Sequence, residues 1–208
     1  MDRMIYVGMA GAKMDMQRQD VLAHNLANVS TTGFRAELQA VRAVPVRGEG
    51  ASARVYSLET TVGYDDAAGT MSFTGRGLDV AVQGKSWLSV QALDGTEAHT
   101  RFGALTVDNE GVLKTLNGFT VLGDGGPITV PPNSIPSIGA DGTVTAKGAN
   151  GNITQIGKLK LVTPDDENRL LRGADGLFRA ATGDTLAADA TARVQSGALE
   201  GSNVNPIE

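Results

Sequence analysis

The sequence predicts a mainly β protein, in which an antiparallel β body carries a long N-terminal α-helix of the coiled-coil type and an extended linker. In the first 28 residues, apolar side chains recur at alternating steps of four and three, which is the spacing of one helix face. After about residue 34 the pattern changes to alternating apolar and polar residues, interrupted by Asp-Gly and Asn-Gly pairs. No strand–helix alternation indicates a parallel sheet.

A narrow apolar stripe runs along the predicted helix, and polar side chains such as Lys13 and Asp20 occupy the other face. Asp2 can cap the start, residues 28–33 stop the helix, and Gly33 is expected to close it in a left-handed conformation. A stripe this narrow suits one or two partner helices, although it could also pack on the β body. We expect it to be an assembly interface, formed by Ile5, Met9, Ala12, Met16, Gln19, Ala23 and Leu26.

The number of Asp-Gly and Asn-Gly pairs differs between segments of the chain and suggests its division into domains. Residues 1–30 form the predicted rod-like helix, and residues 31–75, with fewer turn pairs, are predicted to form an extended connecting segment. An antiparallel β domain is expected over 76–190, because Asp-Gly and Asn-Gly tolerate the positive φ of a type I′ hairpin turn. Its six turn pairs are Asp94-Gly95, Asn117-Gly118, Asp124-Gly125, Asp141-Gly142, Asn150-Gly151 and Asp175-Gly176.

The last stretch, residues 191–208, is predicted to be a return segment that leads into a C-terminal helix. Its final residues, Asn205-Pro206-Ile207-Glu208, place a capping residue before Pro at the first helical position, with Glu three residues after the cap. This is the signature of a helix start. Since the sequence stops there, we expect a C-terminal helix that this chain lacks.

The composition argues against several functional classes. With 18 basic and 23 acidic residues the net charge is −5, and no basic cluster offers a site for nucleic acid. The chain has no Cys, and its two His, His24 and His99, have no further ligands at the spacing of a metal site. No Gly-x-Ser-x-Gly elbow and no complete dinucleotide fingerprint is present. We therefore predict no catalytic residue, metal, cofactor or small-molecule substrate.

No stretch approaches the roughly 20 apolar residues that cross a bilayer, so we predict no membrane span. Charged residues, Lys13, Asp15 and Arg18 among them, interrupt the apolar core that a secretory signal would need. We expect a protein that stays in the cytoplasm or leaves the cell without a cleaved signal.

Residues 23–34 resemble the signature of the bacterial flagellar rod and hook proteins, which reads Asn-Asn-Leu-Ala-Asn followed by Thr-x-Gly-Phe. Here His24 stands in place of the first Asn. The matching motif residues are Asn25, Leu26, Ala27, Asn28, Thr32, Gly33 and Phe34. Further segments fit the family in order, so the resemblance covers nearly the whole chain: 74–84, 100–103, 126–128, 141–144 and 197–206. Residues 1–6 and 42–46 most resemble the proximal-rod (F-type) branch, with a distal-rod or hook-type subunit as the alternative.

This resemblance implies a structural protein of the flagellar basal body and not an enzyme. It implies a rod subunit that polymerises into the axial tube transmitting motor torque to the hook. Its partners would be other copies of itself, other rod proteins and the flagellar type III export apparatus, and it would assemble in the periplasm after export without a cleaved signal peptide. A β-rich hydrolase or carbohydrate-binding module is a remote alternative, which a single Trp, Trp87, disfavours.

Overall fold

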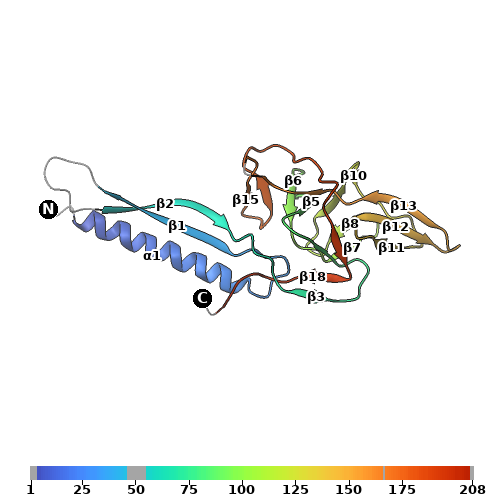
Figure 1. The fold of residues 1–208 in the computed structure, drawn as a ribbon, viewed down its shortest axis with the longest axis horizontal. Coiled ribbons are helices and arrows are strands. Elements are labelled where there is room, and N and C mark those ends of the chain that lie inside the picture. The colour runs from blue at the N-terminus through green and yellow to red at the C-terminus, as the bar shows by residue number, and fades with distance from the viewer. Residues whose placement is uncertain (1–3, 46–54, 166, 207–208) are drawn as a thin grey trace. The chain divides into compact units, whose positions relative to one another are not determined.

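The computed structural model describes residues 4–45, 55–165 and 167–206, and their contacts group into two compact units (Figure 1). Unit 1 comprises Met1–Ser30, Arg35–Ala67 and Ser202–Glu208, and unit 2 comprises Thr31–Phe34 and Ala68–Gly201. The expected fold class is confirmed: the described residues form one N-terminal helix, and their strands pair in antiparallel sheets.

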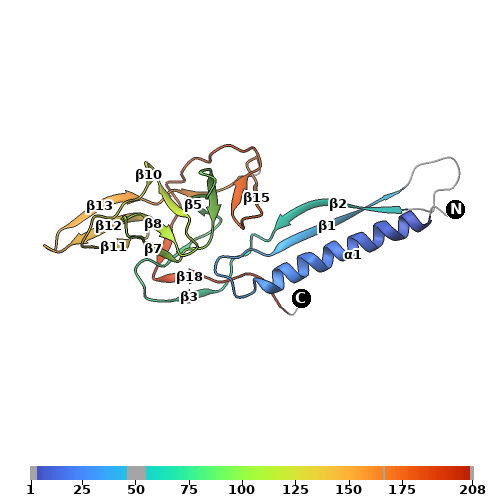
Figure 2. The ribbon, with the colours of Figure 1, turned by 180° about the vertical axis from the view of Figure 1, so that it is seen from behind.

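Unit 1 contains the helix α1 (Met4–Ala27) and a hairpin of β1 (Glu37–Pro45) and β2 (Val55–Tyr64). The strands pair antiparallel from Glu37 opposite Tyr64, with a register shift between Ala40 and Val41. Both ribbon views show α1 running alongside this hairpin (Figure 2). The helix ends before Asn28, as expected, whereas the Asp2 cap lies outside the described residues.

Two sequence expectations need correction in this part of the chain. Gly33 has the expected left-handed backbone, with a φ of 68°, but α1 has already ended at Ala27, so Gly33 does not close the helix. Residues 31–75, expected as an extended connection, contain the paired strands β1 and β2 and the short strand β3 (Met71–Phe73). The pairing carried no turn signal in the sequence, because residues 46–54 contain no Asp-Gly or Asn-Gly pair.

Besides β3, unit 2 holds the remaining strands, each of them two to six residues long. They are β4 (Val80–Val82), β5 (Trp87–Gln91), β6 (Glu97–Thr100), β7 (Leu105–Val107), β8 (Leu113–Thr115), β9 (Thr120–Gly123), β10 (Gly126–Pro127), β11 (Ser134–Ile138), β12 (Thr143–Gly148), β13 (Ile153–Lys158), β14 (Leu161–Val162), β15 (Leu170–Arg172), β16 (Phe178–Ala180), β17 (Val194–Ser196) and β18 (Ala198–Glu200).

The largest sheet of unit 2 has the order β15-β16-β6-β5-β9-β8-β7, with β10 paired to β9 and β14 paired to β5. A separate sheet joins β11, β12 and β13, and the return strands β17 and β18 pair with β4 and β3. The expected return segment, 191–208, therefore supplies two strands to this unit, each in a two-stranded sheet. Buried Leu, Val and Ile side chains, such as Leu88, Val90 and Leu113, form its core.

Every predicted turn pair joins two consecutive strands that pair antiparallel, so the six predicted hairpins are confirmed. The expected type I′ geometry is wrong, because none of the Asp or Asn residues in these pairs has a positive φ. In four of the turns a side-chain oxygen accepts the backbone N–H two residues later, as Asp94 does from Thr96. This Asx-turn bond holds the first residue at negative φ and leaves the left-handed backbone to Gly.

The predicted helix start at the end of the chain falls partly on Ile207 and Glu208, which lie outside the described residues. Among the described residues, no helix is both long and apolar enough to span a bilayer.

Candidate assembly surface

The helix α1 has two opposite faces in unit 1. One row of side chains is half-buried and belongs to Met14, Gln17, Val21 and Asn25. Because the hairpin is the element that runs alongside α1, this row is the face that packs on it. At about 100° per residue, the expected stripe lies roughly 170° away from this row on the helix circumference. The stripe therefore points away from the hairpin.

All seven residues of the expected stripe are exposed on the described chain. Its large members, Ile5, Met9, Met16 and Leu26, leave 69%, 64%, 67% and 60% of their surface accessible. Apolar side chains in such a contiguous row mark an interaction site more often than isolated exposed ones do. We call this row the α1 seam.

A groove of about 640 Å³ adjoins the C-terminal half of the seam within unit 1. Leu22 and Leu26 of α1, Leu38 of β1, and Val204 and Pro206 of the return segment contribute its apolar walls. Leu26 belongs to both the seam and the groove, so the two surfaces meet at this residue.

The first half of the family motif ties the end of α1 to the start of β1. The Asn25 side chain accepts the backbone N–H of Glu37 at 2.8 Å and donates to the carbonyl of the same residue at 3.0 Å. The His24 ring and the Glu37 carboxylate lie 2.9 Å apart, and Asn28 donates to the His24 carbonyl. Leu26 and Ala27 are exposed, so within this half of the motif the amides make contacts and the apolar residues face solvent.

The second half of the motif belongs to unit 2. Gly33 donates its N–H to the Glu200 carbonyl at 2.7 Å, and a Cβ built on Gly33 would lie 2.4 Å from the backbone carbon of Arg101. Phe34 places its ring 4.4 Å from the Arg172 guanidinium, which is cation–π geometry. Thr32 beside them is half-buried. The motif segment 32–34 is therefore seated directly on the β domain backbone.

Sequence reasoning missed the buried ion pair beneath Gly33. The side chains of Arg101 and Glu200 are each 2% exposed, and their charged atoms lie 2.8 Å apart. The second Glu200 oxygen accepts the N–H of Gly69 at 2.9 Å, and Arg101 also donates to the carbonyls of Gly84 and Ser86. Both residues lie in segments that resemble the family, but nothing in the sequence pairs charges 99 positions apart.

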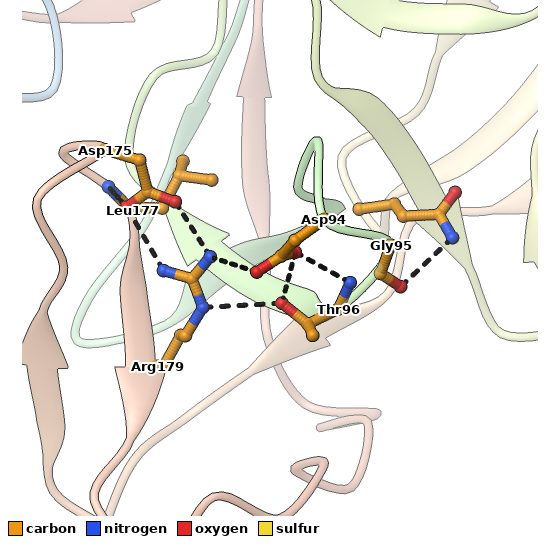
Figure 3. Close-up of polar contacts among 7 residues, drawn as sticks. Asp94, Gly95, Thr96, Asp175, Leu177 and Arg179 are labelled. Atoms are coloured by element: carbon orange, nitrogen blue, oxygen red, sulfur yellow. Dashed lines mark hydrogen bonds and ion pairs between the residues drawn. The ribbon is translucent and has the colours of Figure 1, made fainter.

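The clusters of polar side chains in unit 2 hold turns and strands together. Arg179 of β16 donates to both carboxylate oxygens of Asp175, at 3.1 and 2.8 Å, and lies 3.5 Å from Asp94 and Thr96, so it links two hairpin turns (Figure 3). The hydrogen bonds from Arg179 lower the pKa of Asp175, whereas a general acid at neutral pH needs a raised pKa.

The Ser89 hydroxyl lies 3.2 Å from Nδ1 of His99, the pairing of a nucleophile and a base. Both residues are at most 1% exposed, and burial lowers the pKa of His99 to about 4. The two residues lie opposite each other on β5 and β6, inside the sheet, which is a structural position. Within the described ranges, no three acidic or His side chains gather as a metal site.

An exposed apolar helix face, together with polar clusters that make structural contacts, is typical of a structural protein. The flagella basal body rod protein model matches residues 5–35, and the flagellar hook protein FlgE/F/G D1 domain model matches residues 81–146. The chain is 46% identical to the flagellar basal-body rod protein FlgF of Salmonella typhimurium, over 100% of this chain and 86% of the relative. It is 45% identical to FlgF of Escherichia coli, over 100% and 85%, and 32% identical to the rod protein FlgG of Bacillus subtilis, over 98% and 85%.

The chain therefore belongs to the flagellar basal-body rod protein family, and within that family to the F type. The family is one of structural rod subunits, so the basal-body rod is the place of this protein, and the hydrolase alternative gains no support.

Proposed function

We propose that this rod subunit assembles through the α1 seam, polymerising with copies of itself and with other rod proteins into the axial tube that transmits motor torque to the hook. The observation that carries this proposal is the position of the seam, roughly 170° from the face that packs on the hairpin. Because α1 is packed on one side and exposes apolar side chains on the other, burial of the exposed side by another chain would be favourable.

The energy of the seam suits a polymer. Full burial of a Leu, Ile or Met side chain contributes about 1.5–3 kcal/mol, and the four large seam residues expose 60–69% of their surface. Burying them would contribute roughly 4–8 kcal/mol in total, as an upper bound. Association itself costs about 4–15 kcal/mol, so one seam contact leaves little surplus. A subunit that meets several neighbours at once is held firmly, while two free subunits in solution bind weakly.

We further propose that the subunit reaches the periplasm through the flagellar type III export apparatus without a cleaved signal peptide, as the resemblance of residues 23–34 to rod and hook proteins implies.

Replacing Met16 with Asp tests the assembly proposal. Met16→Asp should abolish motility and incorporation into basal bodies, because the charge would be buried in the assembled seam. The melting temperature of the purified chain should not change, since Met16 is exposed there. Met16→Leu, which keeps an apolar side chain, and Lys13→Gln, which changes the charge by the same amount away from the seam, should both remain motile. A Met16→Asp strain that swims normally would refute the proposal, and a large loss of melting temperature would show that the seam is core.

A further inference from the structure

The β1–β2 hairpin of unit 1 needs a device that fixes its register. Two-stranded hairpins are at best marginally stable in water, and a slip of one residue turns every side chain to the opposite face. The pairing from Glu37 opposite Tyr64 also contains a register shift between Ala40 and Val41, so two registers occur along one hairpin. The contacts at the open end of the hairpin show what fixes it.

The first contact is made by Asn25 from the last turn of α1. Its carboxamide accepts from the N–H of Glu37 and donates to the carbonyl of the same residue, at 2.8 and 3.0 Å. A neighbouring strand would use the same donor and acceptor of a single residue. The side chain of Asn25 therefore stands in for a strand partner at the first position of β1, and it sets where β1 begins relative to the helix.

The second contact is made by Asn203 from the return segment. Its Oδ1 accepts the N–H of Ala36 at 2.6 Å, and its Nδ2 donates to the carbonyls of Asp65 and Ala67, at 3.0 and 2.9 Å. Ala36 directly precedes β1 and Asp65 directly follows β2, and these two residues are bonded to each other as well. The carboxamide of Asn203 thus bonds to the start of β1 and to the end of β2, which lie together at the open end of the hairpin.

These contacts require the chemistry of Asn. Each site uses an acceptor atom and a separate donor atom at the tip of a short side chain, and among short side chains the Asn carboxamide supplies this pair. An Asp of the same shape would place a carboxylate oxygen against one carbonyl at Glu37 and against two at Asp65 and Ala67.

We propose that Asn203 fixes the register of the β1–β2 hairpin, because it bonds to the ends of both strands, and that Asn25 fixes the place of β1 on α1. Together they clamp the open end of the hairpin from two sides, one from the helix and one from the return segment. By holding the hairpin on the Met14–Val21 side of α1, the clamp keeps the seam outward. That last consequence rests on the proposed assembly function, whereas the register itself does not.

The register can be measured directly because the chain has no Cys. Leu38 lies opposite Gly63, so Leu38→Cys with Gly63→Cys reports the native register by disulfide formation in the full chain. Leu38→Cys with Thr61→Cys reports a slip of two residues, which preserves the faces of the strands. In the parent background the native pair should cross-link and the slipped pair should not.

Asn203→Asp should lower native cross-linking and raise slipped cross-linking, because Asn203 bonds to the ends of both strands. Asn25→Asp removes only the contact between α1 and β1. Without the Cys substitutions, both variants should raise amide exchange in β1 and β2 about tenfold or more, while the protection of β5 and β9 stays unchanged. Asn117→Asp makes the same chemical change at an exposed hairpin turn and should alter neither readout. Native cross-linking in Asn203→Asp and unchanged exchange in both clamp variants would overturn the proposal. Because both readouts use the free chain, this result would leave the Met16→Asp test of assembly untouched.

Discussion

Replacing Gly33 with Ala should destabilise unit 2 far more than the same change at another left-handed glycine. Gly33 combines two constraints: a φ of 68°, and a position where a Cβ would approach the Arg101 carbonyl carbon to 2.4 Å and the Phe102 nitrogen to 2.6 Å. Gly176 is the matched control, because it has a φ of 76° and no heavy atom within 4 Å of an added Cβ. Both glycines belong to unit 2, so one unfolding transition reports on both.

The geometry sets the expected magnitudes. A non-glycine residue in the left-handed region costs about 1–2 kcal/mol, which applies equally to both positions. Overpacking against well-ordered neighbours adds typically 1–3 kcal/mol, and this applies only to Gly33, where the neighbours are backbone atoms that cannot rotate aside. Relief by moving the segment would lengthen the 2.7 Å bond from Gly33 to the Glu200 carbonyl. We therefore expect a loss of about 2–5 kcal/mol for Gly33→Ala and about 1–2 kcal/mol for Gly176→Ala.

Urea denaturation of the purified chain, followed by the fluorescence of Trp87 in the core of unit 2, measures both losses. Equal shifts of the midpoint in the two variants would refute the reasoning, because they would show that the segment 32–34 does not bear on the Arg101 backbone in solution. A larger shift for Gly33→Ala, with an unchanged denaturant slope, is the expected result.

Two further predictions concern buried charge in unit 2. Burial lowers the pKa of His99 to about 4, below the 6.5 of the unfolded chain. The free energy of unfolding should therefore be highest above pH 6.5 and fall between pH 6.5 and pH 4, by at most about 1.4 kcal/mol per pH unit. In urea titrations, His99→Gln should remove this pH dependence. Arg101→Met should cost about 3–5 kcal/mol in the same assay, because it leaves the Glu200 carboxylate buried without its cation, and adding Glu200→Leu should recover part of the loss.

The sequence predicted the parts of the fold that local chemistry determines. The turn pairs located six hairpins; in five of them the Gly of the pair is the left-handed residue, and in four of them the Asp or Asn accepts an Asx-turn bond. The end of α1 followed from residues 28–33 in the same way. The type of these turns could not be predicted, because the Asx bond and the type I′ conformation use the same dipeptide.

Long-range pairings were beyond the sequence. The charges of Arg101 and Glu200 become partners only when strand β18 returns to pair with β3. The β1–β2 hairpin was missed for a related reason, because its ends are held by the side chains of Asn25 and Asn203 and no turn pair marks its connection. In a sequence, an Asn usually indicates a turn or a helix cap. Here the side chains of Asn25 and Asn203 hydrogen-bond to backbone groups that lie 12 and 167 positions away.

The two faces of α1 explain why one of them was found and the other was not. The seam was visible because five of its seven residues are Ala, Met or Leu at regular helical spacing, while the packed row mixes Met14 and Val21 with Gln17 and Asn25 and so breaks the apolar pattern. The more apolar face is the one left exposed, and the more polar face makes the intramolecular contact. Within a lone subunit this arrangement is unfavourable, since burying the seam would contribute more than burying the mixed row. The proposed assembly would offset this cost by covering the seam with other chains, and the Asn25 contact to β1 would keep the helix from rotating its apolar side inward.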